Sequence, residues 1–318
     1  MRILITGGAG YIGSIAVEML RQAGFEISIL DDCSTGHRES VPKGARFVEG
    51  SLLRSSDVAQ ALVDCDAVMH FAGKSLVEES VEQPELYWNV NVAGSRTLLD
   101  QMRLAGVSKI VFSSSAATYG EPDVVPISET SATNPTNPYG QTKLAIEAML
   151  SNASREWGLA AASLRYFNVS GALRTARGWL SERHSPETHL IPNALRSSIS
   201  KPIGIFGTDW PTPDGTCVRD YVHVVDLVDA HMKALNRLKV SNHEIFNIGS
   251  GRGYSVREIL GAVGMARKSE MSGVDYPRRA GDPAVLIADI SKARMELNWV
   301  PERDIDVMVS DALASMGN

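Results

Sequence analysis

Short apolar runs alternate with amphipathic segments through the first half of the chain. Runs rich in Ile, Leu, Val and Phe predict β-strands at residues 2–6, 26–31, 45–49, 66–70, 108–113 and 160–167. Apolar residues at helical spacing predict α-helices at residues 12–23, 55–63, 84–105 and 139–157. This alternation predicts an α/β fold in which helices cover both faces of a doubly wound parallel sheet.

The pattern loosens after about residue 170, where prolines become frequent and the expected helices are shorter. These helices are predicted at residues 192–199, 223–237, 255–265 and 304–315. We therefore expect a first domain over residues 1–170 and a smaller, interleaved α/β substrate region over residues 171–318. Because residues 244–248 form a further strand-like run, a segment near 220–250 is expected to return to the first domain.

A glycine-rich turn follows the first predicted strand directly. Gly7, Gly10 and Gly13 have the spacing G-x-x-G-x-x-G, and an amphipathic helix begins within the motif. A strand, a glycine turn and a helix together place a helix N-terminus against a pyrophosphate, as in Rossmann-type folds. The second strand ends in Asp31 and Asp32, about twenty residues later. A carboxylate there accepts hydrogen bonds from a ribose and repels a 2′-phosphate, so the sequence favours NAD over NADP.

Composition narrows the class of protein. The chain has 318 residues, of which 44 % are hydrophobic, and its net charge of −6 argues against nucleic acid as a partner. Three scattered cysteines indicate a reducing compartment, and we expect a cytoplasmic protein. No apolar run is long enough to span a membrane, and because a strand is predicted from residue 2, we expect no signal peptide. No group of His, Cys or acidic residues has metal-ligand spacing, so no metal is expected.

A second motif carries candidate chemistry. Tyr139 and Lys143 are four residues apart at the start of a predicted helix, so the phenol and the ammonium share one helix face. The positive charge would lower the tyrosine pKa, which is about 10 for a free side chain. The run Ser113–Ser115 follows the fifth strand, and a serine hydroxyl there can share a hydrogen bond with the phenol.

Together these motifs resemble the extended short-chain dehydrogenase/reductase family and, within it, the UDP-glucose 4-epimerase branch. The likeness extends over nearly the whole chain, and the motifs beyond the glycine turn are the more specific ones. They are 70–73 (HFAG), 89–91 (NVN), 112–116 (FSSSA), 139–143 (YGQTK), 164–172 (LRYFNVSGA), 189–192 (HLIP), 205–209 (IFGTD), 214–223 (DGTCVRDYVH), 246–250 (FNIGS) and 278–282 (RRAGD).

The resemblance implies a role for each matching residue. Tyr139 would be the acid/base on the sugar 4-hydroxyl, with Lys143 and Ser115 as its catalytic partners. The residues implied to contact NAD are Gly7, Gly10, Tyr11, Ile12, Gly13, Asp31, Asp32, Phe71, Ala72, Gly73, Asn91, Ser113, Tyr139, Lys143 and Tyr166. The residues implied to contact the UDP-sugar are Ser115, Tyr139, Asn168, His189, Leu190, Phe206, Arg219, Arg279, Asp282 and Leu286.

The implied activity is NAD-dependent interconversion of UDP-glucose and UDP-galactose, through a 4-keto sugar whose opposite face takes the hydride back. The family resemblance also implies a homodimer formed through helices 84–105 and 139–157. Another UDP-sugar, namely an N-acetylhexosamine, a pentose or a glucuronate, stays open as the substrate. A dehydratase is disfavoured because Ala116 and Ala117 stand where it needs acids, and the intact Ser115, Tyr139 and Lys143 disfavour a non-catalytic NAD sensor.

The sequence departs from related enzymes at four places. Ser51 stands where an aspartate commonly contacts adenine, and Ser75 where some relatives carry a phosphate-facing lysine, with Lys74 one position early. His189 replaces an asparagine near the uridyl group. Leu286 occupies a sugar-pocket position that is tyrosine in some relatives and cysteine in others, so we expect a wall of intermediate size.

Overall fold

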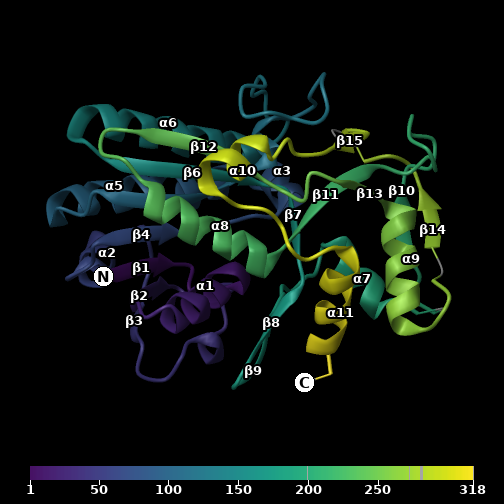
Figure 1. Cartoon of the computed structure of the whole chain (residues 1–318), viewed down its shortest axis with the longest axis horizontal. Helices are drawn as coiled ribbons and strands as arrows, with labels where there is room; N and C mark the ends of the chain where they lie inside the picture. The colour runs from purple at the N-terminus through teal and green to yellow at the C-terminus, as the bar shows by residue number, and fades with distance from the viewer. Residues whose placement is uncertain (199, 272, 280–281, 318) are drawn as a thin grey trace. The chain divides into compact units, whose positions relative to one another are not determined.

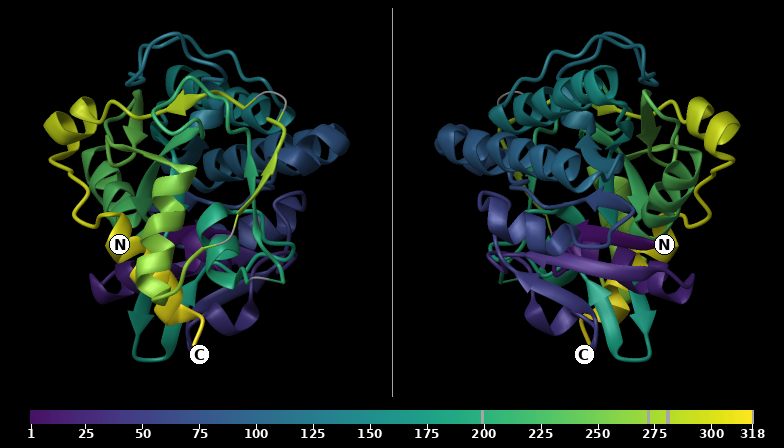
Figure 2. Two further views of the ribbon diagram at one scale, coloured as in Figure 1. Left: turned by 90° about the vertical axis from the view of Figure 1, so that its right-hand side faces the viewer. Right: turned by 90° about the vertical axis from the view of Figure 1, so that its left-hand side faces the viewer.

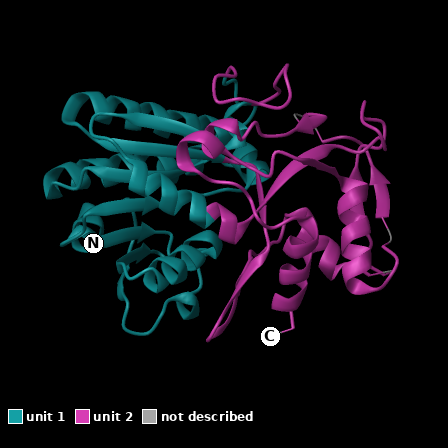
Figure 3. Ribbon diagram, in the orientation of Figure 1, with its two compact units in different colours: residues 1–119, 133–165, 228–246 teal, residues 120–132, 166–227, 247–318 magenta. Residues whose placement is uncertain are grey.

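The computed structural model describes residues 1–318 with the exception of residues 199, 272, 280–281 and 318. The chain divides into two compact units, which Figure 3 colours separately. Unit 1 comprises residues 1–119, 133–165 and 228–246. Unit 2 comprises residues 120–132, 166–227 and 247–318. The chain therefore leaves unit 1 and returns to it more than once.

A seven-stranded sheet forms the centre of unit 1, with the order β12-β6-β5-β4-β1-β2-β3 (Figure 1). The strands are β1 (Arg2–Thr6), β2 (Glu26–Asp31), β3 (Arg46–Glu49), β4 (Ala67–His70), β5 (Lys109–Ser115), β6 (Ala160–Tyr166) and β12 (His243–Ile248). The pairs of β1 with β2 and β4, of β2 with β3 and of β4 with β5 all run parallel. The expected α/β fold with a large parallel sheet is confirmed, and residues 244–248 do lie in its last strand.

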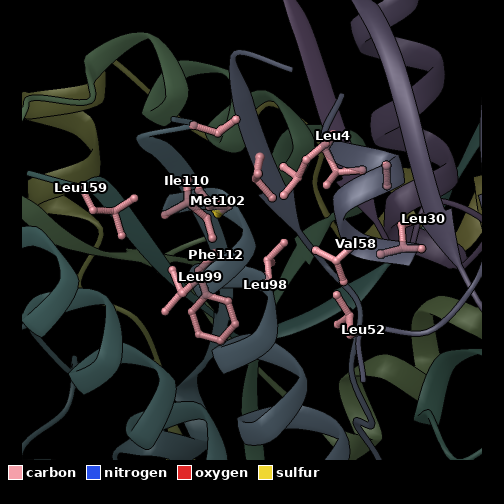
Figure 4. Close-up of a cluster of buried hydrophobic side chains, with 14 of the residues drawn as sticks. Leu4, Leu30, Leu52, Val58, Leu98, Leu99, Met102, Ile110, Phe112 and Leu159 are labelled. Carbon is pink, nitrogen blue, oxygen red and sulfur yellow. The ribbon is translucent and has the colours of Figure 1, made fainter. Parts of the chain in front are cut away.

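Alternating strand residues face two helical layers. On one face, Leu4, Leu30 and Phe112 pack into a hydrophobic cluster with Val58 and Leu98 (Figure 4). This face is covered by α2 (Ser55–Leu62), α5 (Gly94–Ala105) and α6 (Pro138–Trp157), of which α5 and α6 lie side by side (Figure 1 and Figure 2). Helix α1 (Tyr11–Gln22) contacts β1 and β2, and α8 (Val224–Arg237) begins in unit 2 and ends in unit 1.

The prediction of one continuous helix over residues 84–105 is wrong in detail. The segment divides into α4 (Pro84–Tyr87), the π-helix η2 (Trp88–Ala93) and α5, and a short helix that the pattern did not predict, α3 (Val77–Glu82), precedes it. A π-helix is a short local change to i→i+5 hydrogen bonding inside a helical segment, which a periodicity averaged over many residues does not reveal. Two 3-10 helices, η1 (Arg38–Ser40) and η3 (Ala116–Thr118), complete the elements before residue 120.

Unit 2 is built from short strands and helices. Its strands are β7 (Asn168–Ser170), β8 (Ala172–Thr175), β9 (Gly178–Ser181), β10 (Ile203–Phe206), β11 (Val218–His223), β13 (Gly253–Ser255), β14 (Gly273–Tyr276) and β15 (Val285–Leu286). Its other helices are α7 (Leu190–Arg196), α9 (Val256–Arg267), α10 (Ser291–Leu297) and α11 (Ile305–Ser315). Helices α7, α9 and α11 share an apolar cluster that includes Ile191, Val263 and Met308. Strand β11 lies at the centre of the largest sheet of this unit and pairs with β7, β13 and β15.

A search of the described residues finds no helix with both the length and the apolar character that crossing a membrane requires.

Candidate active site

The turn between β1 and α1 leaves no space for a side chain at Gly7 or Gly13. Gly7 has a φ of +71°, and a Cβ built there would lie 2.7 Å from the backbone nitrogen of Ala72. A Cβ on Gly13 would lie 2.0 Å from the carbonyl oxygen of Gly7. Gly10 is the N-cap of α1 and provides no side-chain cap. The turn therefore keeps bare backbone at a helix N-terminus, which is the arrangement that binds a pyrophosphate.

The two aspartates that end β2 have different environments. Asp31 is buried, and its carboxylate accepts hydrogen bonds from the backbone nitrogens of Ala9, at 2.9 Å, and Cys33, at 2.8 Å. Burial raises the pKa of Asp31, although these hydrogen bonds oppose the change. Asp32 is exposed and accepts a hydrogen bond from the Ser34 nitrogen within its own loop. Only Asp31 is thus fixed against the glycine turn, where a ribose would lie.

Asn91 lies in the π-helix and joins two parts of unit 1. Its Oδ1 accepts from the backbone nitrogen of Lys74 at 2.8 Å, and its Nδ2 donates to the Lys74 carbonyl and to Thr142 Oγ1, both at 3.1 Å. A Cβ on Gly73, whose φ is +153°, would lie 2.9 Å from Asn91 Oδ1. Phe71, Ala72 and Gly73 thus follow β4 in a tight turn that Asn91 connects to helix α6. π-helices are frequent at functional sites, and this one places a buried amide between two predicted site segments.

His70 forms a buried hydrogen-bond network with side chains that are distant in the sequence. Its Nδ1 lies 2.7 Å from Thr6 Oγ1 and its Nε2 lies 2.9 Å from Ser95 Oγ, which donates to the Asn91 carbonyl at 2.6 Å. Burial, together with the nearby charge of Lys143, lowers the pKa of His70 to about 3. The ring is therefore neutral at ordinary pH and positions its neighbours without carrying a charge.

The three predicted catalytic residues lie around the junction of β5 and α6. Asn137 caps α6 by accepting from the Gly140 nitrogen at 2.9 Å, which fixes Tyr139 in the first turn. The ammonium of Lys143 donates to the Ser113 carbonyl at 2.8 Å and lies 5.7 Å from the centre of the Tyr139 ring. Ser115 ends β5 and caps η3 by accepting from the Ala117 nitrogen.

The environment sets the protonation of this group. Burial raises the pKa of the Tyr139 phenol, and the hydrogen bond from Ser115 counteracts this effect. Burial lowers the pKa of Lys143 to about 8, against the opposing charge of Glu147. Lys143 therefore stays largely charged near neutral pH and places a positive charge beside the Tyr139 ring. The arrangement can transfer a proton to or from an oxygen held beside Tyr139 and Ser115.

In unit 2, neighbouring strands carry three residues predicted to contact substrate, and a fourth, Asp282, lies beside one of them. Asn168 of β7 is opposite Tyr221 of β11 and hydrogen-bonds its side chain, and Leu286 of β15 is opposite Arg219 of β11. The Arg219 guanidinium lies 3.6 Å from a carboxylate oxygen of Asp282. A polar amide, a cation and an apolar side chain are thus placed on adjacent strands of one sheet.

The second predicted arginine stands apart from this sheet. Arg279 lies over the Phe206 ring at 3.9 Å, and Phe206 stacks on Tyr276 at 5.3 Å. Arg278 instead forms an ion pair with Asp209 at 2.7 Å. The two arginines of the motif at residues 278–282 therefore have different partners: Arg279 lies over an aromatic ring, and Arg278 pairs with an acid. Its residues 280–281 lie outside the described part of the chain.

The remaining predicted residues lie at ends of elements. Tyr166 ends β6, while His189 and Leu190 form the start of α7. His189 Nδ1 lies 2.7 Å from Glu187 Oε1, a contact between side chains two residues apart that was not predicted. Ser51 stands at the position predicted to face adenine, and its backbone nitrogen donates to Asp57 of α2 at 2.9 Å, so an acid lies beside this serine.

Comparisons with known proteins place this arrangement in a family. The sequence profile of the NAD dependent epimerase/dehydratase family matches residues 3–249. The UDP-glucose 4-epimerase of Corynebacterium glutamicum is 49 % identical over 320 residues, covering 99 % of this chain and 95 % of the relative.

Solved structures are similar over the whole chain. The UDP-glucose 4-epimerase from Brucella ovis, crystallised in complex with NAD, is 41 % identical with a TM-score of 0.93, covering 99 % of this chain and 98 % of that one. The enzyme from Bifidobacterium longum, in complex with NAD⁺ and UDP, is 33 % identical with a TM-score of 0.93, covering 100 % and 98 %. The resemblance found in the motifs is confirmed, and the chain belongs to the NAD dependent epimerase/dehydratase family.

Proposed function

We propose that this protein is an NAD-dependent isomerase that interconverts UDP-glucose and UDP-galactose at carbon 4 of the sugar. The observation that carries the proposal is the group of Tyr139, Lys143 and Ser115, in which Lys143 is buried and its ammonium donates to the Ser113 carbonyl at 2.8 Å. Relatives at 40–49 % identity over nearly the full chain are UDP-glucose 4-epimerases, which supports the same activity here.

The residues of unit 1 fit NAD. The turn at Gly7 and Gly13 excludes any Cβ, and Asp31 presents a fixed carboxylate beside it. Gly7, Gly10, Tyr11, Ile12 and Gly13 would hold the pyrophosphate, and Asp31 the adenosine ribose. Bound NAD supplies the acceptor that takes the hydride from carbon 4 and returns it.

The chain's own groups supply the proton chemistry and the anchoring. Tyr139 takes the proton of the sugar 4-hydroxyl and gives it back, and Ser115 hydrogen-bonds the same oxygen. Lys143 holds a positive charge near the phenol, which stabilises its ionised form. In unit 2, Asn168, Arg219 and Arg279 would hold the diphosphate, since guanidinium groups bind phosphate oxygens through charge-assisted hydrogen bonds. His189, Leu190, Phe206 and Asp282 would contact the uridine end, and Leu286 the sugar.

A direct assay tests the proposal. Tag-free protein is incubated with UDP-galactose, formation of UDP-glucose is followed by proton NMR, and the released dinucleotide is identified after denaturation. We expect equilibration of the two sugars without added cofactor, and NAD in the released material. Absence of turnover with every UDP-hexose, UDP-pentose and UDP-hexuronate offered would contradict the proposal, as would stoichiometric NADP.

We further propose a homodimer formed through residues 84–105 and 139–157. Large apolar side chains are exposed on and before the first of these segments, among them Val77 (44 %), Val81 (62 %) and Trp88 (42 %). Light scattering after size exclusion should give twice the mass of the chain, and Trp88→Glu should shift the protein toward monomer.

We also propose that the protein is cytoplasmic. Its three cysteines are all free, which suits a reducing compartment.

A further inference from the structure

Three ionisable side chains gather in the loop between β9 and α7. Glu182, His184 and His189 each offer one ligand atom, and these atoms all lie within 4.8 Å of one another. None of the three has a part in the proton chemistry proposed above. The cluster is contained in eight consecutive residues of unit 2, so it is a local feature.

The loop holds its histidines through a repeated Glu-x-His arrangement. Glu182 Oε1 lies 2.5 Å from His184 Nδ1 and also accepts from the His184 backbone nitrogen at 3.0 Å. Glu187 Oε1 repeats both contacts with His189, at 2.7 Å and 2.8 Å. The second oxygen of Glu182 lies 3.9 Å from His189 Nδ1 and links the two arrangements. Backbone hydrogen bonds thus fix both carboxylates beside imidazole nitrogens.

The two carboxylates are largely buried and already lie beside imidazole and backbone nitrogens. The side chains of Glu182 and Glu187 are only 10 % and 5 % exposed. Glu187 Oε2 is buried without a hydrogen-bond partner, and it lies 3.8 Å from the Arg196 guanidinium. A buried carboxylate is costly unless it is paired or coordinates a metal. His189 is 44 % exposed, so an ion could enter from solvent.

The donor set and its spacing suit one class of ion. Imidazole nitrogens with carboxylate oxygens favour Zn²⁺ and similar transition metals over Mg²⁺ or Ca²⁺. In a tetrahedral zinc site the bonds are about 2.0–2.2 Å long, so neighbouring ligand atoms lie roughly 3.4 Å apart. The observed separations, from 2.5 Å between hydrogen-bonded pairs to 4.8 Å at most, lie on either side of that value. Small side-chain rotations would therefore complete the site, with the ion replacing the protons between imidazole and carboxylate.

We propose that Glu182, His184 and His189 bind one divalent transition-metal ion of the Zn²⁺ type, with Glu187 as the fourth ligand or as the hydrogen-bond partner that orients His189. Such an ion would connect the loop at residues 182–184 to His189, the N-cap of α7, and so restrict the movement of the loop. Glu182 and His184 have no part in the proposed epimerase site, whereas His189 is also proposed to contact the uridine end of the substrate, so zinc binding is measured without UDP-sugar.

The experiment measures zinc binding to the intact, tag-free protein. After treatment with EDTA and dialysis, ZnCl₂ is titrated by calorimetry and in competition with a chromophoric chelator, with MgCl₂ as a parallel titrant. We expect one saturable Zn²⁺ site per chain and no comparable response to Mg²⁺. His184→Ala and His189→Ala should each weaken binding at least tenfold, and X-ray absorption of the zinc-loaded protein should show mixed nitrogen and oxygen ligands.

A matched control distinguishes binding at this site from non-specific binding of zinc to surface histidines. His37 forms a similar pair with Glu39, at 3.8 Å, but has no second histidine beside it, so His37→Ala should leave the titration unchanged. Circular dichroism establishes that each variant is folded, and Glu182→Gln serves as a second variant if an alanine variant is not. The proposal is overturned if no saturable site is found, or if the His184→Ala/His189→Ala double variant binds Zn²⁺ as tightly as the parent.

Discussion

Glu147 and Arg165 form a buried ion pair one helical turn beyond Lys143. Arg165 Nε and Nη2 donate to the two carboxylate oxygens at 2.9 Å and 2.6 Å, and both side chains are only 4 % exposed. The Ser114 hydroxyl donates to the same carboxylate at 2.5 Å. The pair therefore joins α6 to β5 and β6 beneath the catalytic group. It also places a negative charge near Lys143, where burial would otherwise favour the neutral amine.

Removing one partner of this pair should destabilise the protein strongly. Glu147→Ala leaves a buried guanidinium without its counter-ion, and such losses are typically about 3–5 kcal/mol. Urea unfolding should show this decrease in the free energy of unfolding. The double variant Glu147→Leu/Arg165→Met, which removes both charges, should be more stable than the single variant. Equal stability of single and double variants would mean that the pair is not the source of the loss.

Tyr139→Phe tests the proton transfer. The substitution removes the phenolic oxygen while keeping the ring, so the fold and the edge-to-face contact with Tyr87, 6.5 Å away, should persist. We expect turnover to fall at least ~10²-fold, the usual scale of a general acid–base contribution. Single-turnover NMR with the folded variant provides the measurement. Turnover close to that of the parent would show that another group moves the proton.

His70 should make the fold sensitive to acid. Its pKa is about 3 in the folded protein and 6.5 ordinarily, so between these values the unfolded chain binds a proton that the folded chain does not. Stability therefore decreases as pH falls from about 6.5 toward 3, by at most about 1.4 kcal/mol per pH unit for this group. His70→Gln should give a shallower decrease in urea unfolding between pH 6.5 and 4.5. Some slope should remain, because the pKa of buried His223 is also lowered to about 3. Identical slopes in parent and variant would exclude His70 as a contributor.

The sequence predicted the large sheet and the Tyr139–Lys143 helix because both depend on short-range periodicity. Strands β1 and β2 are short runs of mainly apolar residues, and the boundaries predicted for them agree with the structure. The short strands of unit 2 were not predicted, since β7 and β15 have two or three residues and exist through pairing with β11, far away in the chain. The His70 network likewise depends on Thr6 and Ser95, which are 64 and 25 residues away. Contacts of this kind have no local pattern.

Arg219 and Arg279 should each contribute to UDP binding. Replacing either by alanine removes hydrogen bonds to a charged group, which are worth about 1.5–3 kcal/mol, or roughly a tenfold to a hundredfold loss of affinity. Calorimetry with UDP gives the value directly. Arg278→Ala is the matched control, because this neighbour is paired with Asp209 and stacked on Trp210. If both test variants bind UDP like the control, the diphosphate lies elsewhere.

Leu286 should set the size of sugar that the enzyme accepts. It lies opposite Arg219 in the β11–β15 pair and is half-buried, so its side chain neighbours the predicted diphosphate site. Leucine is smaller than tyrosine and larger than cysteine, and an N-acetyl group at carbon 2 needs more space than a hydroxyl. We therefore expect efficient turnover of UDP-glucose and UDP-galactose with weak turnover of the N-acetylated pair. Discrimination by an apolar wall is limited to about 1–3 kcal/mol, so the preference should be partial.

Substitution at this position tests the assignment in both directions. Leu286→Tyr should suppress turnover of the N-acetylated sugars and largely spare the plain hexoses, whereas Leu286→Cys should favour the N-acetylated pair. The quantity to compare is the ratio of kcat/KM values for the two sugar pairs, because this ratio cancels changes in the amount of folded enzyme. A ratio that stays constant across both variants would show that Leu286 does not form the wall of the sugar site.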